Sequence, residues 1–294
     1  MAQTRLNGFI VVLIATVLWS TAGLFVRLAA LDTWSIVAWR SLFAFITLGL
    51  FWLVVERDKP AAIKATFSPP GFLAVAIGVV SGISYVVSLQ LTTVANVMTV
   101  YAALPFIAAI IAFFAFNERA TYRFVICGLV ASVGVAVMMM GVMTTQDSIG
   151  ILAAFVMTAG FAASLVQAKR YPELDMTLVT VAAAGVSAMI AFPLTSSAAP
   201  PNASQLLACA LLGALTTGVA NVMSMVGGRM IRSGEAGLIS LLDVPLGPLW
   251  VWLFFSESVE TNTIIGGSIV LAAVVSYLAR ARRDYQLLGA DPRA

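Results

Sequence analysis

The stretch SGEAGLISLLDVPLGPLWVWLFFSE, from Ser233 to Glu257, decides how the rest of the chain is interpreted. It is long and apolar enough to cross a bilayer, yet Asp243 lies near its middle and Pro245 and Pro248 follow. A charge and two helix-breaking residues at membrane depth are costly unless they face a cavity or a partner. The stretch therefore predicts a membrane span with a functional role.

The same layout occurs earlier in the chain, between Ala95 and Glu118, where Pro105 lies in the middle. A shift of 139 positions places Glu118 on Glu257, and a shift of 142 places the first apolar run on residues 150–169. The chain is therefore interpreted as two related halves and a cytoplasmic tail, with boundaries at residues 1–147, 148–280 and 281–294.

Composition excludes several classes of protein. Of the 294 residues, 61% are hydrophobic and 10% are charged, whereas charged residues make up about 25% of soluble domains. Histidine is absent, the two cysteines, Cys127 and Cys209, have no CxxC spacing, and no GxxxxGK[ST] motif is present. The chain is therefore expected to be a multi-pass membrane protein that is not an enzyme and uses no metal or other cofactor.

Apolar runs of span length, separated by turns or charges, predict ten membrane spans. A polar loop from Glu56 to Pro70 follows the second span, and a tight turn near residues 91–94 separates the third from the fourth. The expected spans cover residues 8–28, 34–55, 71–91, 95–116, 122–143, 149–168, 176–196, 204–227, 233–257 and 262–279.

The distribution of positive charge supports this topology. If the N-terminus is cytoplasmic, every lysine and arginine except Arg27 and Arg40 falls on the inner side. So strong a bias follows the positive-inside rule and predicts that both termini are cytoplasmic, in the cell (inner) membrane. The net charge of +3 then reflects a basic face against anionic lipid, and no nucleic-acid partner is expected.

Five spans in each half have a consequence for symmetry. An odd number of spans per repeat turns the second copy upside down in the membrane. Inverted repeats are typical of secondary transporters, whose binding site lies near the midplane and is lined by broken helices.

Several short motifs carry a family resemblance. The first half has residues 19–23 (WSTAG), 38–40 (AWR) and 117–119 (NER), with Pro105, Gly128 and Gly134; the second half has Pro245, Pro248, Ser256-Glu257 and Gly266-Gly267. This pattern resembles the EamA pattern of the drug/metabolite transporter superfamily. Within the superfamily, the chain is most similar to the bacterial YddG-type exporters of amino acids, especially aromatic ones. The resemblance implies ten helices around a central cavity lined by helices one, three, four, six, eight and nine, with efflux as the direction of transport.

Two helical faces are candidates for the wall of such a cavity. The third span carries Ser81, Ser84, Tyr85 and Ser88 on one face, and the eighth carries Thr217, Asn221 and Ser224 on a similar stripe. Hydrogen bonding between helices is the alternative explanation for these polar groups.

Aromatic residues near the span centres suggest a pocket for a small amphipathic solute such as an amino acid. Packing between helices is the alternative explanation for them. Trp19 and Phe161 are equivalent at the 142-residue shift, so they are expected to face the cavity from opposite halves. The predicted substrate-binding residues are Trp19, Tyr85, Tyr101, Phe161, Asn221 and Asp243.

Two intramembrane charges, Arg40 and Asp243, allow more than one interpretation. They form an ion pair, or Arg40 extends toward the membrane surface, or Asp243 binds a substrate ammonium or carries a proton. The acids at the ends of the fourth and ninth spans, Glu118 and Glu257, are expected to cap loops and form gating contacts. Hinges are predicted at Pro105, Pro245 and Pro248.

The sequence therefore predicts a secondary transporter that exports amino acids, aromatic and other neutral ones, by alternating access through a central cavity. A drug or organic-cation exporter of the same fold is the alternative, since the aromatic cage and Asp243 would also suit a cation. The lipid bilayer is the expected surrounding, and a monomer is compatible with the sequence. Proton-coupled and facilitated transport both remain open.

Overall fold

The computed structural model describes residues 2–116, 122–140, 144–196, 201–228, 230, 239–240 and 242–287. Regular structure in this part of the chain is helical throughout, with no strand. Glu118, for which a loop-capping and gating role is expected, lies outside the described residues.

The described part of the first half contains eight helices, several of which begin at a capping side chain. The carboxylate of Asp32 accepts hydrogen bonds from the amides of Trp34 and Ser35, and the hydroxyl of Ser68 accepts from the amide of Gly71. The helices are α1 (Ala2–Ser20), α2 (Ala22–Ala29), α3 (Thr33–Val55), α4 (Lys59–Thr66), α5 (Pro69–Leu91), α6 (Val94–Ala102), α7 (Leu104–Phe116) and α8 (Tyr122–Met139).

The second half is built in the same way. Asp175 caps one helix through the amides of Thr177 and Leu178, and Asn202 forms a capping box with Gln205 at another. The elements are α9 (Thr145–Arg170), α10 (Met176–Ala191), the 3₁₀ turn η1 (Phe192–Leu194), α11 (Ala203–Ala210), the π-helical segment η2 (Leu211–Val219), α12 (Ala220–Gly228), α14 (Asp243–Phe255) and α15 (Thr261–Leu287).

Within the described residues, six helical stretches are long and apolar enough to cross a membrane, and the bent pair of α6 and α7 makes a seventh span if it is counted as one. Three further apolar helical stretches are shorter, at Ile126–Val137, Asp243–Phe255 and Thr261–Ala273. The protein is therefore an all-helical, multi-pass membrane protein. The ten spans and the cytoplasmic position of both termini remain predictions.

One expectation about element boundaries was wrong. The predicted polar loop at residues 56–70 contains α4, which begins after Asp58 caps its first turn. Asp243 is the first residue of α14. The last helix, α15, continues to Leu287, and the boundaries of the two halves and the tail stay predictions.

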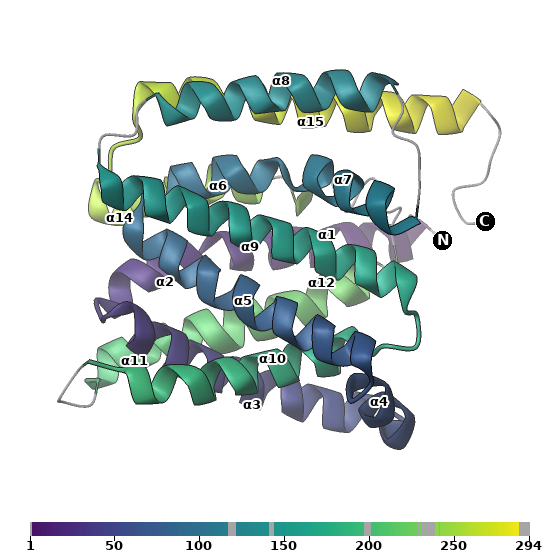
Figure 1. Cartoon of the computed structure of the whole chain (residues 1–294), viewed down its shortest axis with the longest axis vertical. Coiled ribbons are helices and arrows are strands. Elements are labelled where there is room, and N and C mark those ends of the chain that lie inside the picture. Colours follow the sequence, from purple (N-terminus) through teal and green to yellow (C-terminus); the bar gives the residue numbers. More distant parts are fainter. Residues whose placement is uncertain are drawn as a thin grey trace.

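Helices from the two halves pack against one another in pairs. Figure 1 shows α8 and α15 side by side along one edge of the molecule, and the other principal pairs are α5 with α9, α3 with α10, and α1 with α12. The pairing stays the same when the two halves are exchanged. In that exchange α5 takes the place of α12 and α9 takes the place of α1, so the α5–α9 contact becomes the α12–α1 contact. The contact pattern therefore has the pseudo-twofold relation expected of two related repeats.

Glycine residues allow a very close approach at two helix contacts, α8 with α15 and η2 with α3. A Cβ atom added to Gly134 in α8 would lie 2.7 Å from the carbonyl oxygen of Gly266 in α15. A Cβ atom on Gly213 in η2 would lie 2.2 Å from the carbonyl oxygen of Arg40 in α3. Backbones in membrane proteins approach this closely where glycine is present, because no side chain separates them.

The fourth predicted span is broken. α6 and α7 meet at a bend of 43° around Ala103, and Pro105 is the second residue of α7. Proline suits the first turn of a helix because its missing N–H has no acceptor there. This break leaves the end of α6, with Tyr101, at the middle of the bundle.

Candidate functional site: the central cavity

A cavity of about 450 Å³ lies between the two halves of the protein. It is lined by residues of α1, α2, α3, α5 and α6 from the first half, and of α9, α10, η2, α12 and α14 from the second. Its volume is in the range typical of small-molecule sites. Both repeats therefore contribute to a single cavity.

The structure brings all six predicted substrate-binding residues to this cavity. Their side chains come from α1, α5, α6, α9, α12 and α14, and their role in binding a substrate stays a prediction. They are Trp19, Tyr85, Tyr101, Phe161, Asn221 and Asp243.

The aromatic wall of the cavity is formed jointly by the two repeats. The rings of Tyr101 in α6 and Phe161 in α9 meet at 60°, with centroids 6.1 Å apart. Trp19 and Phe161, the pair related by the repeat, both line the cavity from opposite halves. Rings in such an arrangement offer an apolar body and polar edges to a solute of similar size.

Asp243 supplies a negative charge at this wall. The residue is only 8% exposed, and its Oδ1 has no hydrogen-bond partner in the structure. As the first residue of α14, it lies where the helix dipole favours a negative charge. A buried carboxylate oxygen without a donor is costly, so it favours a positively charged or protonated group beside it.

Arg40 supplies a positive charge that the sequence analysis did not assign to the site. Its Nη1 donates to the carbonyl of Gly82 at 3.1 Å and its Nη2 to the hydroxyl of Thr217 at 3.4 Å. The guanidinium carbon lies 5.4 Å from the centroid of the Tyr85 ring. Arg40 and Asp243, both fully described, are not joined by an ion pair, so that interpretation is wrong.

The predicted polar faces contribute only in part. Ser81 lines the cavity, but its hydroxyl donates to the carbonyl of Met157 at 2.9 Å and so also joins α5 to α9. Ser88 bonds the carbonyl of Tyr85 within its own helix. On the other stripe, Thr217 and Asn221 line the cavity. Both explanations of these polar faces therefore apply: some of the groups line the cavity, and some hydroxyls form hydrogen bonds between helices beside it.

The expected set of lining helices was incomplete. α3 and α10, the second and seventh predicted spans, also line the cavity, through residues such as Ser41, Thr180 and Ser187. A signal was present in α10, where Thr180 and Ser187 are seven residues apart and thus share a helical face.

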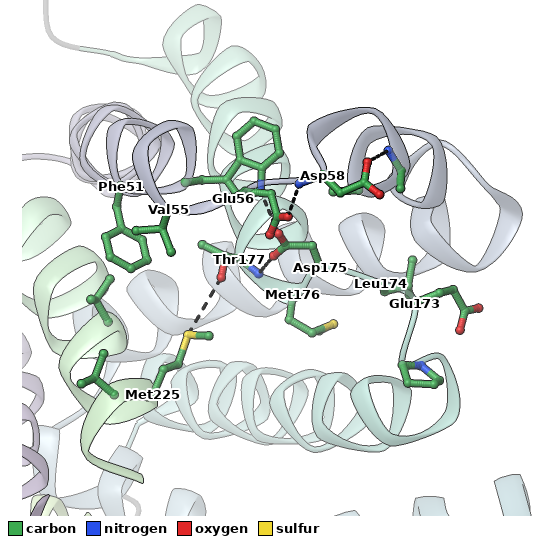
Figure 2. A pocket seen from close by; sticks show the side chains of 16 residues that line it. Phe51, Val55, Glu56, Asp58, Glu173, Leu174, Asp175, Met176, Thr177 and Met225 are labelled. Atoms are coloured by element: carbon green, nitrogen blue, oxygen red, sulfur yellow. Dashed lines mark hydrogen bonds between the residues drawn. The ribbon is translucent and has the colours of Figure 1, made fainter. Parts of the chain in front are cut away.

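A second space, a groove of about 550 Å³, lies beside the junction of α9 and α10. It shares three lining residues with the cavity, Met176, Thr177 and Met225, so the two spaces are neighbours. Figure 2 shows Thr177 and Met225 facing each other there, with the hydroxyl 3.9 Å from the sulfur. Asp175 accepts a 2.7 Å hydrogen bond from the indole of Trp52 and fixes the wall of this mouth.

The opposite end of the bundle holds an ion pair between the halves. Nε of Arg27, in α2, lies 3.1 Å from Oε2 of Glu257, beyond α14. Arg27 also donates to the carbonyls of Leu89 and Thr92, and Oε1 of Glu257 accepts from the amide of Val94 at the start of α6. These contacts tie four elements together at the end away from the mouth.

Comparison with known proteins identifies the family. A family model described as the EamA-like transporter family matches the chain twice, over residues 6–140 and 147–279. The chain therefore belongs to the EamA-like transporter family. It is a membrane transporter of small solutes, and the resemblance stated from its motifs is confirmed at this level.

A solved crystal structure is similar to the chain, with a TM-score of 0.64 and 19% sequence identity. The match covers 96% of this chain and 99% of that one, so the two share a fold over their whole length. No curated protein matches the chain. The narrower similarity to YddG-type amino-acid exporters stays a prediction.

Proposed function

We propose that this protein exports amino acids, aromatic and other neutral ones, by alternating access through the central cavity. The observation that carries the proposal is the unpaired Oδ1 of Asp243 in a cavity walled by aromatic side chains of both repeats. The ammonium group of an amino acid would supply the missing donor, and the rings would contact an apolar or aromatic side chain.

The arrangement of the two halves supports alternating access. The cavity shares three wall residues with the groove at the α9–α10 junction, while the Arg27–Glu257 contact ties the halves together at the other end. In the proposed cycle this contact opens as the mouth closes, with bending near Pro105, Pro245 and Pro248. Inverted-repeat transporters expose a midplane site to the two sides in turn by such a motion.

The test is uptake of labelled phenylalanine into liposomes holding the purified protein, with and without an imposed pH gradient. Asp243→Asn removes the charge at the cavity wall, and Glu260→Gln is the matched control at an exposed position that lines neither the cavity nor the groove. We expect saturable uptake by the wild type and the control. Loss of a charged hydrogen bond predicts about a tenfold to hundredfold lower affinity in Asp243→Asn.

The gradient separates the two modes of transport. Uptake without a gradient would indicate facilitated transport, whereas uptake that requires the gradient and disappears in Asp243→Asn would indicate proton coupling through this residue. If the wild type moves cationic dyes but no amino acid, the amino-acid proposal is wrong and the organic-cation exporter replaces it.

A further inference from the structure

Arg40 places an uncompensated positive charge in the cavity. Two of its nitrogens bond neutral oxygens, those of Gly82 and Thr217, while its Nε is buried without a hydrogen-bond partner. Among the described residues, the other charged residue that lines the cavity is Asp243, and it does not pair with Arg40. A guanidinium at membrane depth is costly without an anion, so the site favours a ligand that brings one.

Tyr85 and Tyr101 line the cavity together with both charged residues, Arg40 and Asp243. The ring of Tyr85 lies beneath the guanidinium of Arg40, with its centroid 5.4 Å from the guanidinium carbon. A solute that lies against this aromatic wall therefore meets a positive and a negative group of the protein in the same cavity.

We infer that Arg40 binds the carboxylate of the transported solute, so that the cavity selects zwitterions over cations. The inference rests on the proposed function and names the group that discriminates between amino acids and organic cations. Arginine suits the task because its planar fork of donors matches the two oxygens of a carboxylate. Asp243 takes the ammonium, and together the two charges set the orientation of the solute.

The local structure keeps Arg40 in place for this role. The guanidinium is held between α5, through Gly82, and η2, through Thr217, with the Tyr85 ring beneath it. The backbone of Arg40 packs directly on Gly213. A side chain held from several elements loses little further freedom on binding, which favours affinity.

The test compares two ligands that differ only at the carboxyl group. L-phenylalanine and L-phenylalaninamide share the ring and the ammonium, but the amide carries no negative charge. Dissociation constants of both are measured by titration calorimetry on detergent-purified wild type, Arg40→Gln and Arg57→Gln. The last is the matched control, because Arg57 is exposed and does not line the cavity.

We expect wild type and Arg57→Gln to prefer phenylalanine by at least about tenfold, as a charged hydrogen bond predicts. In Arg40→Gln the preference should disappear, because phenylalanine binds more weakly while the amide binds as before. If Arg40 only held helices together, its substitution would weaken the binding of both ligands equally. The ratio of the two dissociation constants therefore distinguishes a ligand-binding role of Arg40 from a structural one.

Three results would overturn the inference in different ways. Equal binding of the two ligands by the wild type refutes the role of Arg40 but leaves amino-acid transport in place. An equal loss of both ligands in Arg40→Gln assigns the residue to helix packing alone. If the wild type binds the amide but not phenylalanine, the proposed function fails together with the inference.

Discussion

Phe161 is 38% exposed and lines the central cavity, so part of its ring is available to a solute. Its contact with Tyr101 is edge-on, which leaves a face open. Aromatic pairs contribute about 0.5–1.5 kcal/mol beyond the area that they bury. Phe161 is thus placed to favour aromatic substrates over small ones.

We expect Phe161→Ala to weaken phenylalanine binding about threefold to tenfold, because a ring contact and buried apolar area are lost. Binding of alanine, which does not reach the ring, should change little. Phe114→Ala on α7 is the matched control, since Phe114 is 82% exposed and does not line the cavity. Competition assays measure both ligands, and an equal loss of both would contradict the assignment.

At the scale of elements, the contact between α3 and η2 positions the polar groups of the cavity. Gly213 allows η2 to lie against the backbone of Arg40, and Thr217, one turn later, reaches the guanidinium. π-Helical turns are rare and are often found at functional sites. This contact therefore links helix packing to the geometry of the binding site.

Gly213→Ala is expected to destabilise the protein by about 1–3 kcal/mol, because the added methyl group overlaps α3 and forces the helices apart. Gly49→Ala on α3 is the matched control, because its Cβ atom would lie 3.8 Å from Val181, an ordinary contact. Alanine also favours the helix over glycine at such a position. Thermal unfolding in detergent measures both variants, and similar melting temperatures would contradict the close contact.

At the scale of the molecule, the Arg27–Glu257 contact holds the end that lies away from the mouth. Because it joins the two halves, its removal should favour the state in which that end is open. Exposed ion pairs contribute little, but this pair is partly buried and also caps α6 through Val94.

The measurement is the rate at which a membrane-impermeant thiol reagent labels a cysteine placed at Ala22, a cavity residue near that end. Glu257→Gln is expected to raise this rate. All variants are made in a protein in which Cys127 and Cys209 have been replaced. Glu260→Gln, at an exposed position after the same helix, is the matched control. Unchanged labelling in Glu257→Gln would show that the contact does not keep this end closed.

Much of this architecture could be predicted from the chain, because apolar runs and repeated motifs are local or periodic signals. Trp19 and Phe161 were predicted to line the cavity because they lie near span centres and are equivalent in the two repeats, and Asp243 because a charge is costly in a membrane. The position of Arg40 was not predictable in this way. It depends on the partners Gly82 and Thr217, which lie far away in the sequence, and on the close approach of η2 to α3.

The number of residues between Leu211 and Val219 also matters for function, because this segment is a π-helix. A π-helix takes more residues per turn than an α-helix, and one residue corresponds to about 100° of rotation in an α-helix. Removal of a single residue here would let the segment relax to an α-helix and change the position of Thr217 relative to Arg40 and the cavity. Insertions and deletions in this short stretch should therefore alter transport more severely than most single substitutions.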